Sequence, residues 1–133
     1  MKIFRQFFLP ACIIILVVMA GCQKDTTGEA NLTVETLPLA NGHVEAPAPG
    51  PNFPLKVTVT SAIPPSGVKI DVVARLDGGT LAFFSDSKTT STAITDFTIT
   101  GTTAGVVSVA EITVTSVSTP SNKWTGSYKY SRK

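Results

Sequence analysis

Hydrophobic and polar residues alternate over most of the chain after residue 54. Segments 55–60 and 68–76 place apolar residues at every second position, which is typical of half-buried strands. Segments 81–84, 94–100, 106–117 and 124–130 are further candidates, rich in β-branched or aromatic residues. Turn signals such as Asp77-Gly78-Gly79 separate these segments, and none of them has a helical period. The pattern therefore predicts an all-β domain over residues 54–133.

About six or seven short strands with regular turn signals are typical of a small antiparallel β-sandwich. In strand number and patterning the segment resembles the immunoglobulin-like (Ig-like) and fibronectin-type-III-like modules of exported bacterial proteins. It departs from antibody domains because their cysteine pair is absent and Trp124 lies in the last predicted strand. The resemblance implies a sandwich fold and does not specify a ligand.

The first 22 residues have a different character. Lys2 and Arg5 precede an apolar run over residues 7–20, with no acidic residue among them. A membrane-spanning helix needs about 20 apolar residues, whereas the apolar region of a signal peptide needs about 7–15. A run of about 14 residues therefore favours a signal peptide over a stable transmembrane helix.

Met19-Ala20-Gly21-Cys22 ends this apolar region. It resembles the bacterial lipobox, with Met19 in place of the usual leucine. The resemblance implies a lipoprotein signal peptide over residues 1–21 and cleavage between Gly21 and Cys22. Cys22 would then carry covalent diacylglycerol and an N-acyl chain such as palmitate, and no other cofactor is expected. Two or three long chains make membrane attachment effectively permanent.

Gln23-Lys24-Asp25 follows the cysteine, with no aspartate directly after it. This run resembles the export signal of Bacteroidota lipoproteins, which implies an outer-membrane protein that can be exposed at the cell surface. The alternative is a plain polar linker. Either way, we expect a lipid-anchored protein of the cell envelope.

Residues 22–53 are predicted to be a lipidated N-terminus followed by a flexible, proline-rich tether. Pro47, Pro49, Pro51 and Pro54 favour extended backbone because proline fixes φ and has no N–H donor. Residues 32–37 alternate apolar and polar positions, so they either belong to the tether or form an edge strand. His43 lies in this stretch and is expected to be a solvated linker residue.

Charge and chemistry restrict the function. All nine acidic residues follow Cys22, and removal of Lys2 and Arg5 leaves nine basic ones, so no basic patch for nucleic acid is expected. His43 is the only histidine and lies outside the predicted domain, so no domain histidine can activate a serine. The aspartates fall in no calcium-loop motif. We therefore predict a protein that is not an enzyme and binds no metal.

The aromatic residues are the main candidates for ligand contact. Trp124, Tyr128 and Tyr130 share one face of the last strand, which is either a core face or a platform for stacking sugars. Phe83 and Phe84 are expected to point to opposite faces of their strand. The leading hypothesis is a membrane-anchored binding or structural module with a protein or glycan partner. The alternatives are a carbohydrate-binding lipoprotein of a glycan-uptake system and a pilin-like subunit that donates segment 32–37.

Overall fold

The structure, a computed structural model, describes residues 28–133. The predicted signal peptide, its cleavage site at Gly21 and the lipid attachment site Cys22 lie outside the described residues. The described chain forms eight strands: β1 (Val34–Leu37), β2 (Asn41–Val44), β3 (Phe53–Val59), β4 (Val68–Leu76), β5 (Ala82–Thr90), β6 (Ile94–Ile99), β7 (Val107–Ser116) and β8 (Lys123–Ser131). Each segment predicted to be a strand after residue 54 overlaps one of them.

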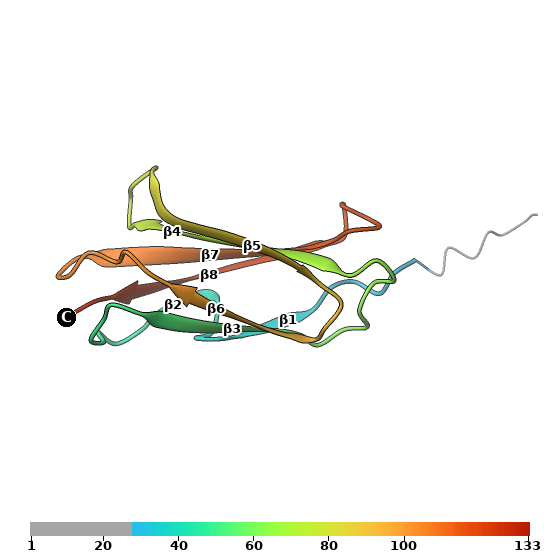
Figure 1. The fold of residues 1–133 in the computed structure, drawn as a ribbon, viewed down its shortest axis with the longest axis horizontal. Coiled ribbons are helices and arrows are strands. Elements are labelled where there is room, and N and C mark those ends of the chain that lie inside the picture. Colours follow the sequence, from blue (N-terminus) through green and yellow to red (C-terminus); the bar gives the residue numbers. More distant parts are fainter. Residues whose placement is uncertain (1–27) are drawn as a thin grey trace, which may run out of the picture.

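The strands form two facing sheets, as Figure 1 shows, so the predicted small β-sandwich is confirmed. One sheet has the order β1-β3-β6 and the other the order β2-β8-β7-β4-β5. Strands β4, β7 and β8 lie side by side in the five-stranded sheet. All pairings are antiparallel except that of β2 with β8, which is parallel. Within residues 28–133 there is no helix long and apolar enough to cross a membrane.

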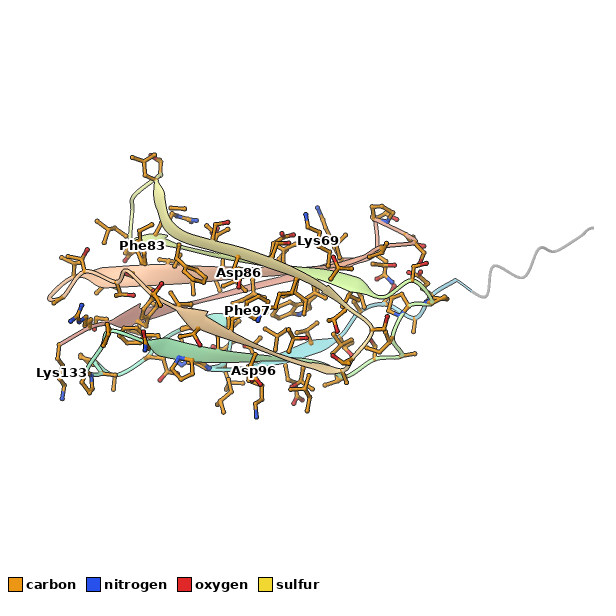
Figure 2. All side chains as sticks on the ribbon, in the orientation of Figure 1. Lys69, Phe83, Asp86, Asp96, Phe97 and Lys133 are labelled. Atoms are coloured by element: carbon orange, nitrogen blue, oxygen red, sulfur yellow. The ribbon has the colours of Figure 1, made fainter. Side chains whose placement is uncertain are left out.

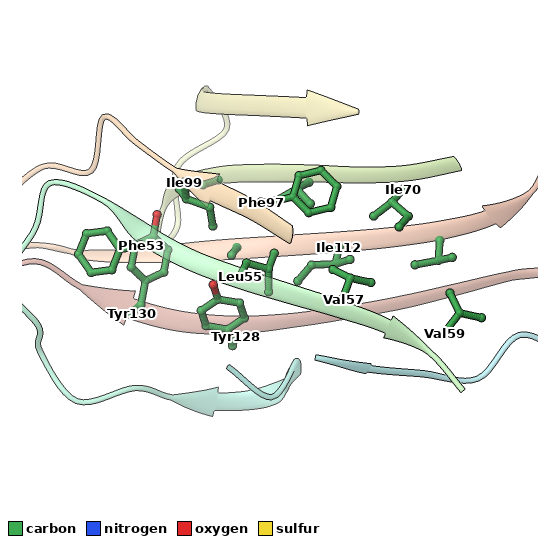
Figure 3. Packing of buried hydrophobic residues seen from close by; sticks show 14 of the residues in the cluster. Phe53, Leu55, Val57, Val59, Ile70, Phe97, Ile99, Ile112, Tyr128 and Tyr130 are labelled. Carbon is green, nitrogen blue, oxygen red and sulfur yellow. The ribbon is translucent and has the colours of Figure 1, made fainter. Parts of the chain in front are cut away.

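The core lies between the sheets and follows the period of two that the sequence predicts. Strand β3 alternates buried and outward-facing residues along its length, and β4, β7 and β8 supply the facing layer. Figure 3 shows these side chains meeting between the two layers. The largest of them that are fully buried include Leu55, Ile70, Ile99, Ile112 and Tyr128.

The tether prediction is wrong for residues 34–53, which belong to the sandwich. Strand β1 pairs with β3, which confirms the edge-strand alternative for segment 32–37. Further along, the amide of Glu45 donates to the Lys129 carbonyl (2.8 Å) and that of Ala48 to the Ser131 carbonyl (3.1 Å). Prolines fit this segment because a sheet edge does not need every N–H donor. The sandwich therefore begins well before residue 54.

The prediction that Phe83 and Phe84 point to opposite faces is also wrong. Phe84 lies opposite Ala74, whereas Arg75 lies opposite Ala82, so Phe83 is an extra residue in the register. Such a β-bulge places two residues of one strand against one of its partner and breaks the alternation of faces. Both phenylalanines consequently pack against the core.

Candidate functional site

The sandwich has two open sides, and Lys88 closes the one between β5 and β6. Lys88 lies opposite Ile70, whose side chain is in the core, so its side chain starts from the inward face of β5 and reaches solvent at the edge of the sandwich. Its Nζ donates a hydrogen bond to the Asp96 carbonyl (2.6 Å) and lies 4.6 Å from the centre of the Phe97 ring. Figure 2 shows Phe97 between the two sheets at this side. An inward-facing charge also protects an edge strand against pairing with another chain.

The opposite side, between β2 and β3, is left open as a groove with a volume of about 480 Å³. It exists because β1 pairs with β3 only as far as Leu37 opposite Lys56, after which the chain crosses to the other sheet. The first residues of β3 therefore have no strand beside them on this side. The groove is lined by Leu37, Pro38, Glu45, Ala46, Ala48, Phe53, Pro54, Leu55, Lys56, Asp96, Phe97, Thr98, Tyr128 and Tyr130.

Aromatic rings form the inner wall of this groove. The Phe53 and Tyr130 ring centres are 4.9 Å apart and those of Tyr128 and Tyr130 are 5.8 Å apart, as Figure 3 illustrates. The Tyr130 and Thr102 hydroxyls share a hydrogen bond of 3.0 Å. The Tyr128 hydroxyl has no hydrogen-bond partner among the described residues. Burial raises the pKa of both phenols, so they stay protonated at neutral pH.

Glu45, Lys56 and Asp96 bring charged side chains to the groove, and His43 packs against one of its tyrosines. The His43 ring is stacked on Tyr128 with centres 6.4 Å apart, so it is not the solvated linker residue that was expected. Its Nε2 lies 2.5 Å from a Glu45 carboxylate oxygen and its Nδ1 lies 2.9 Å from Asn41 Oδ1. Lys56 also lines the groove and makes no ion pair with the rest of the described chain. The site thus combines an apolar interior with a mixed charged rim.

The predicted aromatic platform does not form an exposed surface. Tyr128 and Tyr130 are only 1% and 2% exposed, so the core alternative is confirmed for both. Trp124 is half-buried and packs against the core beside them. The tyrosines reach the site as its inner wall, and their rings cannot stack on a sugar from solvent.

Sequence reasoning missed the other wall of the groove. Pro38, Ala46 and Ala48 lie in the stretch that was expected to be a tether. The alternation in segment 32–37 was the one signal that this stretch returns to the sheet. No comparable pattern marks residues 45–48, because the groove arises from the crossing between sheets.

The outer face of the five-stranded sheet is polar, and several of its charges form ion pairs. Arg75 donates two hydrogen bonds to the Glu111 carboxylate (2.5 and 2.6 Å), and Lys129 bonds Asp77 at 2.9 Å. The hydrogen bonds from Arg75 lower the pKa of Glu111. Glu111, Thr113, Thr125 and Ser127 surround a shallow polar depression on this face. In the part of the chain that is described, no three histidine, cysteine or acidic residues cluster as metal ligands would.

Comparisons with known proteins identified no relative of the chain. No protein-family model matches the chain, and no curated protein sequence matches it. The inference of function therefore rests on the geometry of the groove.

Proposed function

We propose that this protein is a non-enzymatic lipoprotein of the cell envelope whose groove between β2 and β3 binds a protein partner. The observation that supports this most directly is the difference between the two open sides of the sandwich. Lys88 closes one side, whereas the other is apolar and open. A concave apolar site with a few polar groups at its rim is the usual form of a binding site.

The surface beside the groove favours a macromolecular partner. Leu37 lines the groove and is 68% exposed, and Leu39, two residues further along the chain, is 53% exposed, so the chain that leaves β1 carries an exposed apolar ridge. Contiguous exposed apolar surface with a polar rim is characteristic of protein interfaces. A small ligand enclosed in the groove would gain little from an exposed ridge outside it.

The groove has little of the chemistry that an enzyme needs. Its polar side chains are Glu45, Lys56, Asp96, Thr98 and the two tyrosines, and His43 stacks on Tyr128. Both ring nitrogens of His43 already have partners in Asn41 and Glu45. No activated nucleophile beside a free base is present in this set. These features support a binding role.

The two alternative functions have less support. Carbohydrate binding on the predicted stacking platform requires exposed aromatic rings, and the two tyrosines are buried. Strand donation by segment 32–37 would require β1 to leave its own sheet, where it pairs with β3. A glycan array probed with the unlipidated protein tests the first alternative directly. Binding of any oligosaccharide that Tyr128→Phe leaves unchanged and Leu39→Asp abolishes would favour a glycan partner at the same groove.

Anchoring through Cys22 would present the groove sideways to the membrane. Figure 1 shows the described chain entering at one end of the sandwich and reaching its C-terminus at the other. The groove lies along the side between these ends. Such an orientation suits contact with another protein in or on the same membrane, which we propose to be the outer membrane.

Membrane attachment is tested by Cys22→Ser in the full-length precursor. We expect loss of palmitate labelling and release from the membrane fraction, because serine cannot form the thioether. Cys12→Ser is the matched control, since Cys12 would be removed with the signal peptide. Labelling that survives Cys22→Ser would refute the anchor.

Partner binding is tested by site-specific photocrosslinking in living cells. A benzophenone side chain at position 39 should give a defined crosslinked protein, because that position is exposed and directly follows Pro38, which lines the groove. The same side chain at position 81, which is 86% exposed and lies in the β4–β5 loop, should give none. Equal crosslinking at both positions would show that the groove has no special role.

A further inference from the structure

We propose that the end of the sandwich formed by the loop between β7 and β8 lies on the lipid headgroups of the membrane to which Cys22 is anchored. Residues 117–123, which join the two strands, are called the 117–123 tip below. This inference rests on the proposed function in taking Cys22 as the lipid attachment site, and it is independent of what binds in the groove. It assigns a second interaction surface, whose partner is the surface of a lipid bilayer.

Asn122 fixes the start of the described chain to this tip. The Leu32 amide donates to Asn122 Oδ1 (3.0 Å). Asn122 Nδ2 in turn donates to the Ala30 carbonyl (3.1 Å) and to the Glu29 carboxylate (3.2 Å). Ser118 donates to the other oxygen of that carboxylate, and the Leu32 side chain is buried in the core. These contacts, called the clamp below, hold the chain to the sandwich from residue 29 onward.

The length of the chain limits how far the clamp can lie from the anchor. Only six residues, 23–28, separate Cys22 from Glu29. A chain extends by at most about 3.3–3.6 Å per residue, so the Cα atoms of these two residues lie within about 25 Å of each other. The clamp therefore keeps the 117–123 tip within reach of the membrane surface.

The opposite end of the sandwich is much further from the clamp. Figure 1 shows the described chain entering at the end where the β7–β8 loop lies and reaching its C-terminus at the other. Strand β4 has nine residues and spans the sandwich between these ends, which corresponds to about 30 Å. Arg132 and Lys133 are basic, but they lie at this distant end. Reach thus favours the tip over the C-terminal end as the surface in contact with lipid.

The exposed side chains of the tip suit a lipid surface. Val117 is 45% exposed, and Pro120 in the same loop is exposed as well. Lys123 is exposed and makes no ion pair within residues 28–133, so its ammonium group is available to lipid phosphates. Lysines close to a membrane surface are attracted to anionic lipids. Glu29, the one acidic residue among residues 28–33 and 117–123, has both carboxylate oxygens bonded within the clamp.

Quenching of a fluorophore by spin-labelled headgroups tests this inference. The mature lipidated chain is reconstituted in vesicles of phosphatidylethanolamine and phosphatidylglycerol. The thioether occupies the thiol of Cys22, so a single introduced cysteine can carry the fluorophore. Ser121→Cys places it on the tip, and Leu81→Cys, the matched control, places it in the β4–β5 loop. We expect at least about threefold stronger quenching at position 121, because position 81 lies about 30 Å further from the clamp.

Two further changes test the tether and the tip separately. About 20 glycine and serine residues inserted after Gly28 add roughly 25 Å of average span, so quenching at position 121 should fall at least about twofold. Lys123→Glu should lower this quenching as well, because it places a negative charge beside the lipid phosphates. Lys133→Glu is the matched control, since it makes the same charge change at the opposite end, and should leave quenching unchanged. Both lysines are exposed, so circular dichroism spectra should stay the same.

The outcomes separate this inference from the proposed function, because flotation with the vesicles reports the anchor alone. A chain that floats but is quenched equally at positions 121 and 81 would overturn the inference while upholding the anchor. Unchanged quenching after the insertion, or equal effects of Lys123→Glu and Lys133→Glu, would also overturn it. A mature chain that does not float would overturn both the inference and the anchor. The photocrosslink at position 39 tests the groove independently of all these results.

Discussion

The indole ring of Trp124 lies over Gly126, two positions further along β8 and on the same face of the strand. A Cβ atom at Gly126 would come within 2.4 Å of Trp124 Cη2 and within 2.6 Å of the Ala40 carbonyl oxygen. Glycine is therefore required where the chain between β1 and β2 crosses from one sheet to the other. The same crossing leaves the groove open, because β1 stops pairing with β3 at Leu37.

We expect Gly126→Ala to destabilise the domain by about 1–3 kcal/mol, the usual cost of overpacking a well-packed site. Urea unfolding of the two proteins measures the difference. Ser127→Ala on the opposite face of β8 is the matched control and should change stability little. A Gly126→Ala protein as stable as wild type would show that the Trp124 ring moves aside without cost.

Trp124 and Gly126 also show what could be predicted from the sequence. Their strand, their shared face and the buried tyrosines follow from the alternation of residues 123–130 alone. That alternation reports which face a residue occupies but not what packs against it, so the contact with Ala40 could not be foreseen. The groove depends on such contacts, because it forms where segment 38–48 leaves one sheet and joins the edge of the other. Prolines in that segment suggested a tether, although proline is equally compatible with a sheet edge.

Removal of the hydroxyl group should affect the stability of the domain differently at the two tyrosines of the groove. Tyr130→Phe leaves the buried Thr102 hydroxyl without its partner, so we expect a loss of about 1 kcal/mol or more. Tyr128→Phe removes a buried hydroxyl that has no partner in the described chain, so stability should be unchanged or higher. Thermal unfolding of both variants checks this. Equal destabilisation would mean that the Tyr128 hydroxyl bonds a buried water molecule.

Truncation tests the domain boundary. A chain of residues 28–133 should fold, whereas residues 46–133 should be several kcal/mol less stable or unfolded. The shorter chain lacks β1 and β2 together with the buried Leu32, and burial of one leucine alone contributes about 1.5–3 kcal/mol. Equal melting temperatures for the two chains would restore the view that residues up to 53 are only a tether.

Lys88→Ala should open the closed side of the sandwich. The variant loses a hydrogen bond to the Asp96 carbonyl and a cation–π contact with Phe97. Exposed cation–π contacts contribute about 0.5–1 kcal/mol to stability. It also removes an inward-facing charge from the β5 edge, so we expect oligomers or aggregates that elute earlier than the monomer on size exclusion. Lys123→Ala, which removes another exposed lysine that makes no ion pair within residues 28–133, is the control. Identical stability and elution for the two variants would contradict the closing role of Lys88.

The ion pair of Arg75 and Glu111 should make the domain less stable as the pH is lowered. Because hydrogen bonds from Arg75 lower the pKa of Glu111 below its ordinary value of 4.5, the folded state favours the ionised carboxylate. This contribution is fully present above about pH 5 and is lost as the pH falls below 4.5 and through the lowered pKa of the folded state. Glu111→Gln keeps the shape of the side chain but cannot ionise. Its loss of stability between pH 7 and pH 3 should therefore be smaller than that of wild type.

Other carboxylates titrate in the same range, so the comparison needs Glu35→Gln as a control, because Glu35 is exposed and makes no ion pair with the described residues. Urea midpoints at pH 7, 5 and 3 for the three proteins measure the effect. If Glu111→Gln and wild type lose the same stability on acidification, the pair contributes nothing in solution, as many surface ion pairs do.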